Sequence, residues 1–442
     1  MMNLATKIKR QLAAKALQRQ LGRVAEGQAE TFPAGPSNEL LAQTCDFDRF
    51  PGALQVRIIE EGGRRFGLAS PFFRAHEGIP GATTRIEGRD YVNFASYNYL
   101  GLNGDPRVIA KAVDAIHRYG TSAAASRMVA GERPIHRELE AALAAFYETD
   151  DCLAFVSGHA TNVTTIGFLF GPRDLIIHDA LAHNSILQGA ALSGAKRLAF
   201  PHNDCDALEE LLGRVRKNYQ RALVVVEGLY SMDGDFPDLR RLVEIKRRHS
   251  AILMVDEAHS LGVMGETGRG LREHCGVDGR DVDIWMGTLS KTLAGCGGFI
   301  AGSKALVEQL RYLAPGFLYS VGMSPPLAAS ALAALEILRA EPQRVATLHR
   351  RGRLFLDEAR RLGLDTGTSA GLSIVPIIAG SSLKACEWAN RMFEHGVNVM
   401  PIFYPAVEEQ AARLRFFVCS DHSEAHIRDT VATLGRVAGT SA

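Results

Sequence analysis

Short runs of apolar residues recur through the middle of the chain, and they constrain the fold more than any other feature. They stand at residues 152–156, 174–178, 222–227, 252–256, 283–287 and 298–301. Segments of helix length lie between several of them, at 184–193, 207–216 and 239–249. A strand that is apolar along its whole length is typical of a sheet buried on both faces. The pattern therefore predicts an α/β fold with a large, mostly parallel sheet covered by helices.

The last third of the chain alternates helical and extended segments more closely. Helical periodicity is present at 326–339, 344–362, 383–395 and 424–438, and strand patterns at 373–379, 397–402 and 414–419. Near the N-terminus, alternating patterns at 54–58 and 90–94 indicate a small antiparallel element. These changes in pattern along the chain predict four parts. They are a basic arm and linker at 1–45, a small segment at 46–95, a large domain at 96–325, and a smaller C-terminal α/β domain at 326–442.

Composition excludes several classes of protein. The 442 residues carry 50 Lys+Arg and 49 Asp+Glu, a net charge of +1, so no nucleic-acid partner is expected. Seven cysteines lie far apart without a C-x-x-C pair, which indicates reduced thiols in a cytoplasmic protein and no zinc site. The uncharged stretch 312–335 is broken by proline and glycine, and we expect a buried loop entering a core helix rather than a membrane span.

The first 25 residues form a separate basic segment. They contain six Lys or Arg and no acid, and their apolar residues recur at near-helical spacing. Three interpretations stay open: a solvated helical arm, a docking surface for an acidic partner or an anionic membrane face, or a transit peptide. The absence of serine makes the transit peptide the least favoured of the three.

Two strand ends carry residues whose position suggests a ligand. Gly158 opens the turn between a predicted strand and a helix, where free backbone N–H groups and the positive end of the helix dipole suit a phosphate. Asp256 ends an apolar strand, where the loss of hydration costs a carboxylate free energy unless a cation compensates for it. Either feature alone is also explained as an ordinary turn or cap, so neither defines a site by itself.

A third strand end carries a lysine. Lys291 follows the predicted strand at 283–287 and is surrounded by small residues and glycines. Partial burial lowers the pKa of an amine and prepares it to form a Schiff base. Thr288 and Ser290 add hydroxyl groups that suit a phosphate. A phosphate turn, an acid and a lysine in this order fit pyridoxal 5′-phosphate (PLP), with the acid on the pyridinium nitrogen and the lysine on the aldehyde.

A longer series of motifs carries a family resemblance from about Tyr91 to the C-terminus. The series comprises SYNYLG at 96–101, SR at 126–127, HRELE at 136–140, HNSI at 183–186, HND at 202–204, YSMDGD at 230–235, DEAH at 256–259, GxxGRG at 265–270 and the segment around Lys291. In this order the motifs resemble those of the α-oxoamine synthases, a family of fold-type I PLP enzymes. The resemblance implies the fold-type I architecture with a large sheet domain and a smaller C-terminal domain.

The resemblance also assigns roles. Lys291 is implied to hold the cofactor and to move the α-proton, Asp256 to pair with the pyridine nitrogen, and His183 to stack on the ring and polarise the thioester carbonyl. The remaining cofactor contacts it implies are Gly158, His159, Ser231, His259, Thr288 and Ser290, with Tyr319 and Ser320 reaching the phosphate from a partner subunit of a homodimer. Arg415 and Asn98 are implied to bind the amino acid.

The implied reaction is a decarboxylative condensation of an amino acid with an acyl thioester to give an α-amino ketone. Ser290 directly before Lys291 is similar to serine palmitoyltransferases and to oxoamine synthases of polyketide assembly, and it favours serine over glycine or alanine. Phe403-Tyr404-Pro405 instead looks like glycine C-acetyltransferase, so glycine C-acetyltransferase and 8-amino-7-oxononanoate synthase activities stay open. The donor is coenzyme A or an acyl carrier protein, and the basic arm suits the acidic surface of such a carrier.

Three other functions fit the sequence less well. Residues 256–259 also spell the DEAH motif of helicase-type ATPases, but the chain has no G-x-x-x-x-G-K-[ST] loop. An aminotransferase on the same fold would release no carbon dioxide and would need a keto-acid acceptor. A non-catalytic subunit of a synthase would lack the lysine, and Lys291 is present with its surrounding residues.

Overall fold

The computed structural model describes residues 44–53, 55–57, 60, 67–404 and 406–440. The chain divides into two units, Met1–Ser70 and Pro71–Ala442. In the first unit, the 3-10 helix η1 (Phe47–Arg49) is capped by Asp46, whose side chain accepts a hydrogen bond from the backbone of Asp48. The strand predicted at 54–58 is wrong where it is described, because residues 55–57 are helical. The basic arm at 1–25 lies outside the described residues.

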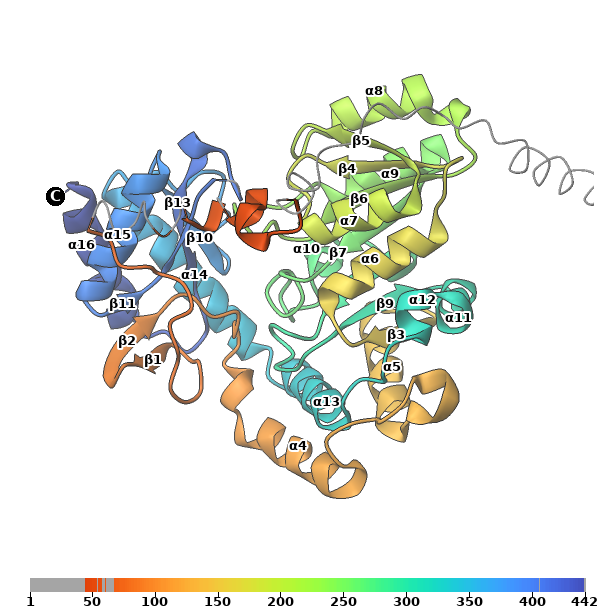
Figure 1. The fold of residues 1–442 in the computed structure, drawn as a ribbon, viewed down its shortest axis with the longest axis horizontal. Coiled ribbons are helices and arrows are strands. Elements are labelled where there is room, and N and C mark those ends of the chain that lie inside the picture. The colour runs from red at the N-terminus through yellow and green to blue at the C-terminus, as the bar shows by residue number, and fades with distance from the viewer. Residues whose placement is uncertain (1–43, 54, 58–59, 61–66, 405, 441–442) are drawn as a thin grey trace, which may run out of the picture. The chain divides into compact units, whose positions relative to one another are not determined.

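A seven-stranded sheet forms the centre of the second unit (Figure 1). Its strands lie in the order β3-β9-β8-β7-β6-β4-β5. Their bounds are β3 Asp151–Phe155, β4 Leu175–Asp179, β5 Lys196–Phe200, β6 Ala222–Glu227, β7 Ile252–Asp256, β8 Ile284–Thr288 and β9 Gly298–Gly302. Only β9 runs antiparallel to its neighbours β3 and β8. The predicted large and mostly parallel sheet is confirmed.

Helices cover both faces of this sheet, which explains why its strands are apolar throughout. On one face the side chains of alternate strand residues pack against α6 (Gly158–Leu169), α7 (Asn184–Ser193), α11 (Lys304–Leu313) and α12 (Pro315–Leu318). On the other face they pack against α5 (Pro134–Tyr147), α8 (Cys205–Val215), α9 (Leu239–His249) and α13 (Pro325–Ala340). The carboxyl ends of the parallel strands therefore open at one edge between two layers of helices, where ligands bind in such folds.

The C-terminal part contains two smaller sheets. One has the order β10-β13-β12, with β10 Ile374–Ile378, β12 Met400–Ile402 and β13 Arg413–Phe417, and it packs against α14 (Gln343–Arg361), α15 (Ser382–Glu394) and α16 (Glu424–Ala438). The other has the order β1-β2-β11, with β1 Thr83–Ile86, β2 Arg89–Asn93 and β11 Val397–Asn398. The strand predicted at 397–402 is thus divided between two sheets, and β2 joins the N-terminal segment to the C-terminal part.

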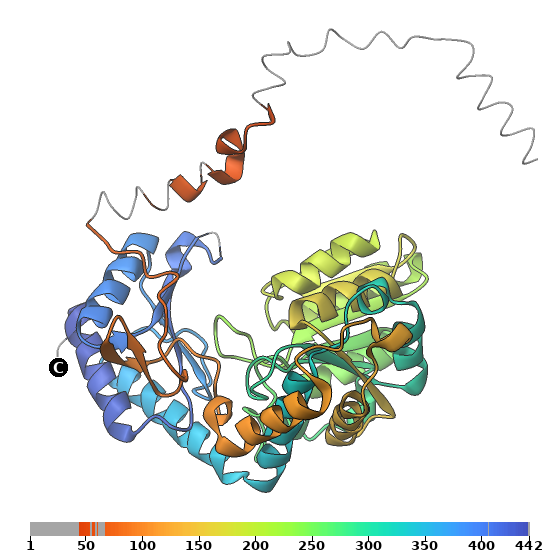
Figure 2. The same cartoon turned by 60° about the horizontal axis from the view of Figure 1, so that its bottom comes forward.

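The uncharged stretch 312–335 enters a core helix as the sequence predicts, but the predicted burial of its loop is wrong, because Tyr319 is 88% and Val321 50% exposed. It passes from the end of α11 through α12 and a loop into α13. Pro325 and Pro326 occupy the first turn of α13, where backbone N–H groups have no partner within the helix, so proline loses no hydrogen bond there. Helix α13 packs against α4 (Pro106–Tyr119), and the two lie side by side in Figures 1 and 2. Within the described residues, no helix is both long enough and apolar enough to cross a membrane.

Candidate active site

Lys291 lies in the turn that follows β8, beside a cavity of about 450 Å³. The cavity is lined by His76, Pro80, Asn93, Ala95, Ser96, Tyr97, Asn98, Asn103, Ser290, Lys291, Ala294 and Gly295. The amine of Lys291 is 5.6 Å from the centroid of the Tyr97 ring. Burial lowers the pKa of Lys291 to about 8, while Asp256 and Glu227 oppose this shift and Arg415 adds to it. A substantial fraction of the amine is therefore neutral near physiological pH, as a nucleophile requires.

Asp256, the last residue of β7, is buried and receives two hydrogen bonds. Its Oδ1 accepts from the backbone of Ala258 at 2.9 Å, and its Oδ2 accepts from the side-chain amide of Asn162 at 2.7 Å. Asn162 lies on α6, four residues after Gly158, and is itself buried. Because both carboxylate oxygens have a donor, the orientation of the Asp256 side chain is fixed.

Glu227 is a second buried acid that sequence reasoning did not single out. It ends β6 in direct register with Asp256 on the adjacent strand. Burial raises the pKa of Glu227 to about 8. The charge of Asp256 also raises this pKa, whereas the charge of Lys291 lowers it. The same signal that identified Asp256, an acid at the end of an apolar strand, could have found it. One site thus holds two neighbouring carboxyl groups and a lysine, and the proton affinities of Glu227 and Lys291 are shifted.

The position of Glu227 predicts a pH-dependent stability. A carboxyl group whose pKa is higher in the folded chain than in the unfolded chain destabilises the fold increasingly as pH rises from about 4.5 through about 8, because only the folded state disfavours its charge. We expect Glu227→Gln to raise the free energy of urea unfolding of the cofactor-free protein at pH 9 by about 1 kcal/mol or more, and to leave it nearly unchanged at pH 5. Glu244→Gln, on the exposed face of α9, is the matched control. Equal pH slopes for wild type and Glu227→Gln would contradict the prediction.

Two histidines approach the site from different elements. His183 caps the N-terminus of α7, and its Nδ1 lies 2.7 Å from Ser185 Oγ. Loss of hydration lowers the pKa of His183. The charge of Asp256 opposes this shift, and the charges of Lys291, His159 and Arg415 add to it. His259 is buried, with its Nδ1 2.7 Å from the phenol oxygen of Tyr99. Both rings are therefore neutral near pH 7 and can donate or accept hydrogen bonds without a charge.

The residues predicted for a phosphate gather around the start of α6. A Cβ at Gly158 would lie 2.8 Å from Thr288 Oγ1, so no larger residue fits between the helix end and β8. Thr288 Oγ1 donates to the backbone oxygen of Gly297 at 3.0 Å, and Ser290 Oγ accepts from the backbone of Gly297 at 3.3 Å. His159, on the first turn of α6, has its ring 6.5 Å from that of His183. Free helix N–H groups with two neighbouring hydroxyls form a donor set that a phosphate accepts.

Arg415, in β13, is buried, yet no acidic side chain neutralises it among the described residues. Its Nη1 donates to the backbone oxygen of Ser231 at 3.1 Å, and its Nε has no acceptor in the described chain. Its guanidinium stacks 4.5 Å from the centroid of the Phe417 ring. By contrast Arg413, two residues earlier, pairs with Asp233 at 2.5 Å. A buried arginine without a counterion is suited to receive a carboxylate from a ligand.

The other predicted residues differ in how closely they join this site. Asn98 lines the cavity beside Lys291, with its Oδ1 accepting from the backbone of Asn103 at 3.1 Å. Ser231 is buried beneath Arg415. Tyr319 is 88% exposed in the loop after α12, and Ser320 Oγ donates to the backbone oxygen of Gly316 at 2.7 Å. Within the described chain no hydrogen bond or ring contact links Tyr319 or Ser320 to the residues around Lys291.

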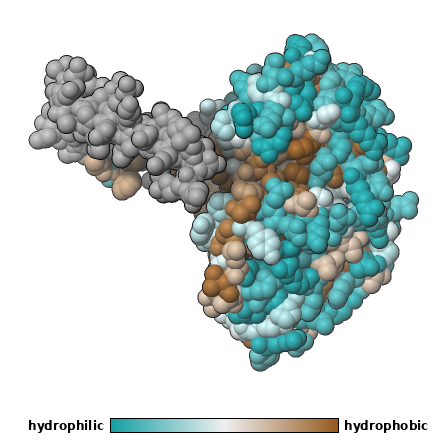
Figure 3. Space-filling model, turned by 90° about the vertical axis from the view of Figure 1, so that its right-hand side faces the viewer, coloured by the Kyte–Doolittle hydropathy of each residue, from teal (hydrophilic) through white to brown (hydrophobic). Residues whose placement is uncertain are grey.

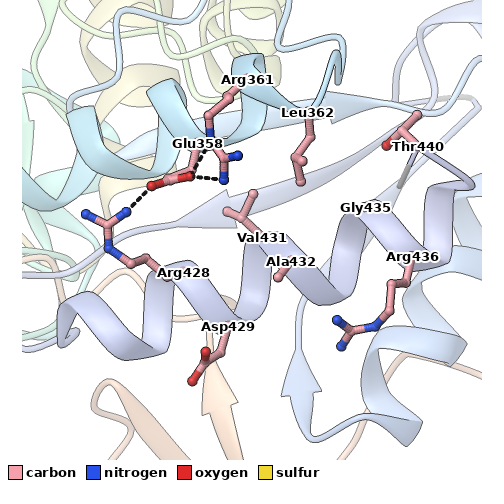
Figure 4. Close-up of a pocket in the computed structure, with 10 residues that line it drawn as sticks. All are labelled: Glu358, Arg361, Leu362, Arg428, Asp429, Val431, Ala432, Gly435, Arg436 and Thr440. Carbon is pink, nitrogen blue, oxygen red and sulfur yellow. Dashed lines mark hydrogen bonds and ion pairs between the residues drawn. The ribbon is translucent and has the colours of Figure 1, made fainter. Parts of the chain in front are cut away.

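A pocket between α14 and α16 is a poorer candidate (Figure 4). Its volume is about 400 Å³, and its lining includes three arginines. Glu358 pairs with both Arg361 and Arg428, which leaves little net charge for a ligand. Its lining holds no lysine, histidine or cysteine that could act as a nucleophile or base. The cavity beside Lys291 is therefore the candidate active site.

Comparison with known proteins identifies the family of the chain. The family described as aminotransferase class I and II matches residues 89–434. The 8-amino-7-oxononanoate synthase of Symbiobacterium thermophilum is 38% identical over 352 residues, which are 80% of this chain and 89% of the relative. The serine palmitoyltransferase of Sphingomonas wittichii superposes with a TM-score of 0.85 at 30% identity, covering 90% of this chain and all of that one. A variant serine palmitoyltransferase from S. paucimobilis, with a bound PLP–myriocin aldimine, superposes with a TM-score of 0.84 at 29% identity, covering 89% and 98% of the two chains.

The chain belongs to the class I and II aminotransferase family and has its fold-type I architecture, with the seven-stranded sheet at its centre. Within that family it is a member of the α-oxoamine synthases, which are PLP-dependent acyltransferases. The resemblance read from the motifs between Tyr91 and the C-terminus is confirmed.

Proposed function

We propose that the protein condenses an amino acid, with serine favoured, and an acyl thioester into an α-amino ketone. The carbonyl carbon of the thioester is joined to the α-carbon of the amino acid, the carboxyl group leaves as carbon dioxide, and the thiol is released. The observation that carries the proposal is the buried guanidinium of Arg415, which has no acidic counterion among the described residues and whose charge lowers the pKa of Lys291. An amino-acid carboxylate would supply the missing charge beside the lysine.

The donor set around Lys291 fits PLP. Lys291 would hold its aldehyde, Asp256 its pyridine nitrogen, His259 its ring hydroxyl, and the start of α6 with Thr288, Ser290 and His159 its phosphate. Gly158 supports this fit because its missing side chain lets the helix N-terminus approach β8. When bound, PLP supplies a sink for the electron pair left on the α-carbon after a bond to it breaks.

The side chains of this chain then divide the remaining work. Arg415 binds and orients the substrate carboxylate, with Asn98 at the wall of the same cavity. Lys291, whose amine is half neutral near pH 8, takes the α-proton as a general base. Asp256 is held in its orientation by hydrogen bonds from Asn162 and Ala258. His183, which is neutral, offers a hydrogen bond to the carbonyl oxygen of the thioester.

The amino acid and the acyl donor are proposed on separate observations. Ser290, which lines the cavity beside Lys291, supports serine. The name of the Symbiobacterium relative supports a second candidate, an 8-amino-7-oxononanoate synthase-like activity. Coenzyme A and an acyl carrier protein both fit the proposed chemistry as donors, and the arm at 1–25 is proposed as the docking segment for the carrier.

We also propose a homodimer with shared active sites. Tyr319 lies in the loop after α12 and is largely exposed, and it makes no hydrogen bond or ring contact with the site residues in the described chain. Tyr312, Leu313 and Val321 near it are also at least half exposed. Figure 3 shows a band of apolar residues on an otherwise hydrophilic face, which is typical of a surface covered by a partner. In the dimer, Tyr319 and Ser320 of each subunit would contact the phosphate of the cofactor bound by the other subunit.

The test uses the PLP-loaded protein with carboxyl-labelled serine, glycine or alanine and a long-chain acyl-coenzyme A. We expect labelled carbon dioxide and an equal amount of free thiol to appear with one amino acid, serine, and mass spectrometry to find the α-amino ketone. Release of a keto acid without carbon dioxide, dependent on a keto-acid acceptor, would instead identify an aminotransferase. Activity with alanine alone would favour the second candidate.

A further inference from the structure

We infer that Asn162 and Ser185 are positioning residues that link Asp256 to His183 and hold the His183 ring in the tautomer with its proton on Nε2. The inference deepens the proposed function, on which it rests for the role of the two end residues. The four side chains form one continuous series of hydrogen bonds between β7, α6 and α7.

The amide of Asn162 fixes the direction of the series. Its Nδ2 lies 2.7 Å from Asp256 Oδ2 and 2.9 Å from Ser185 Oγ. A carboxylate only accepts hydrogen bonds, so the nitrogen of the amide, and not its oxygen, must face Asp256. The two protons of that nitrogen then go to two acceptors, Asp256 and Ser185. Asn162 Oδ1 has no partner among the described residues, so the two hydrogen bonds of the nitrogen alone set the orientation of the amide.

The hydroxyl of Ser185 carries the direction on to the histidine. Ser185 Oγ accepts from Asn162 and lies 2.7 Å from His183 Nδ1. The backbone N–H of Ser185 points to the same Nδ1 at 3.3 Å. A backbone N–H can only donate, so Nδ1 carries no proton, and the hydroxyl also donates to it. The proton of the neutral ring is therefore on Nε2, directed away from α7.

This arrangement has a chemical consequence for the site. Protonation of His183 would place a proton on Nδ1 against two donors, so the network opposes the charged ring, in agreement with the lowered pKa of His183. The ring keeps one free donor, Nε2–H, which suits the oxygen of a carbonyl group. Asn162 and Ser185 are both 1% exposed, so water does not replace either hydrogen bond when it is lost.

The experiment compares two variants with two matched controls. Asn162→Ala and Ser185→Ala remove the two links. Thr165→Val on α6 and Ser193→Ala on α7 remove buried hydroxyls from the same two helices outside the series. Each protein is labelled with ¹⁵N-histidine, the His183 signals are assigned with His183→Gln, and the tautomer is read in the cofactor-free state. The PLP dissociation constant and kcat are measured on the same set.

We expect wild type and both controls to show Nε2–H, and Asn162→Ala and Ser185→Ala to shift the ring toward a mixture of tautomers. Asn162→Ala should weaken PLP binding about 10-fold, because Asp256 loses a buried donor, whereas Ser185→Ala should lower kcat with little change in PLP affinity. If Asn162→Ala does not fold, Asn162→Ser and Ser185→Ala carry the test.

A proton on Nδ1 of His183 in the wild type would overturn the inference, as would variants that match their controls in tautomer and PLP affinity. Failure of the proposed function has a different signature. In that case no amino acid would release carbon dioxide in the wild type, yet the tautomer and the PLP affinity would still respond to Asn162→Ala.

Discussion

Lys291→Ala is expected to lower kcat for carbon dioxide release by about 10³-fold and to abolish the absorbance of lysine-bound cofactor. Lys291 is the lysine beside the cavity, and burial lowers the pKa of its amine to about 8. Alanine removes both the nucleophile that holds the cofactor and the base that takes the α-proton. Absorbance spectra and single-turnover kinetics of the PLP-loaded protein measure the two losses separately.

Lys304→Ala is the matched control for this prediction. Lys304 lies at the start of α11 with an exposed side chain, 3.8 Å from Glu308, and its loss should change neither kcat nor the absorbance. Added methylamine should partly restore proton transfer in Lys291→Ala, because it replaces the missing base, but it should not restore a covalent bond between the cofactor and the protein. A Lys291→Ala protein that retains wild-type kcat would remove Lys291 from the reaction and with it the proposed function.

The central sheet was predictable because burial on both faces leaves a simple pattern. The strand β7 and the helices α7, α9 and α16 have the bounds that the sequence predicts. The strand β5 (Lys196–Phe200) escaped prediction, because it lies at the edge of the sheet and only Phe200 is fully buried. Its sequence, KRLAF, therefore lacks the continuous apolar run that identified its neighbours.

The wrong strand at 54–58 has a related cause. In the sequence LQVRI, apolar residues stand at the first, third and fifth positions. This spacing suits the alternation of a strand, but the first and fifth positions also share one face of a helix. Five residues cannot distinguish the two periods, and the described residues 55–57 are helical.

The site was predictable where a residue stands at a strand end, and not where it depends on packing between elements. Lys291 and Asp256 follow apolar strands, and the order of strands in a parallel sheet brings their ends together. The contact between Asn162 and Asp256 joins residues 94 positions apart and depends on how α6 lies on the sheet. Nothing in the spacing of Asn162 along the sequence identifies this partner.

Arg415→Met is expected to raise the KM for the amino acid by about 10²-fold while leaving the stability of the fold unchanged or higher. The side chain of Arg415 is buried and has no counterion in the described part of the chain, so its charge costs stability in the absence of substrate. Its loss removes a charge-assisted bond to the substrate carboxylate, an interaction that costs 2–5 kcal/mol or more when one partner is truncated. Steady-state kinetics and urea unfolding measure the two effects.

Arg413→Met is the contrasting variant, since it lies on the same strand and is equally buried. Arg413 pairs with Asp233, so its removal leaves that carboxylate unpaired and should destabilise the protein by about 3 kcal/mol. Serine amide, which lacks the carboxylate, separates binding from packing. The wild type should bind it far more weakly than serine, as judged by the change in cofactor absorbance, whereas Arg415→Met should bind the two alike. If Arg415→Met keeps the wild-type preference for serine over its amide, the substrate carboxylate is bound elsewhere.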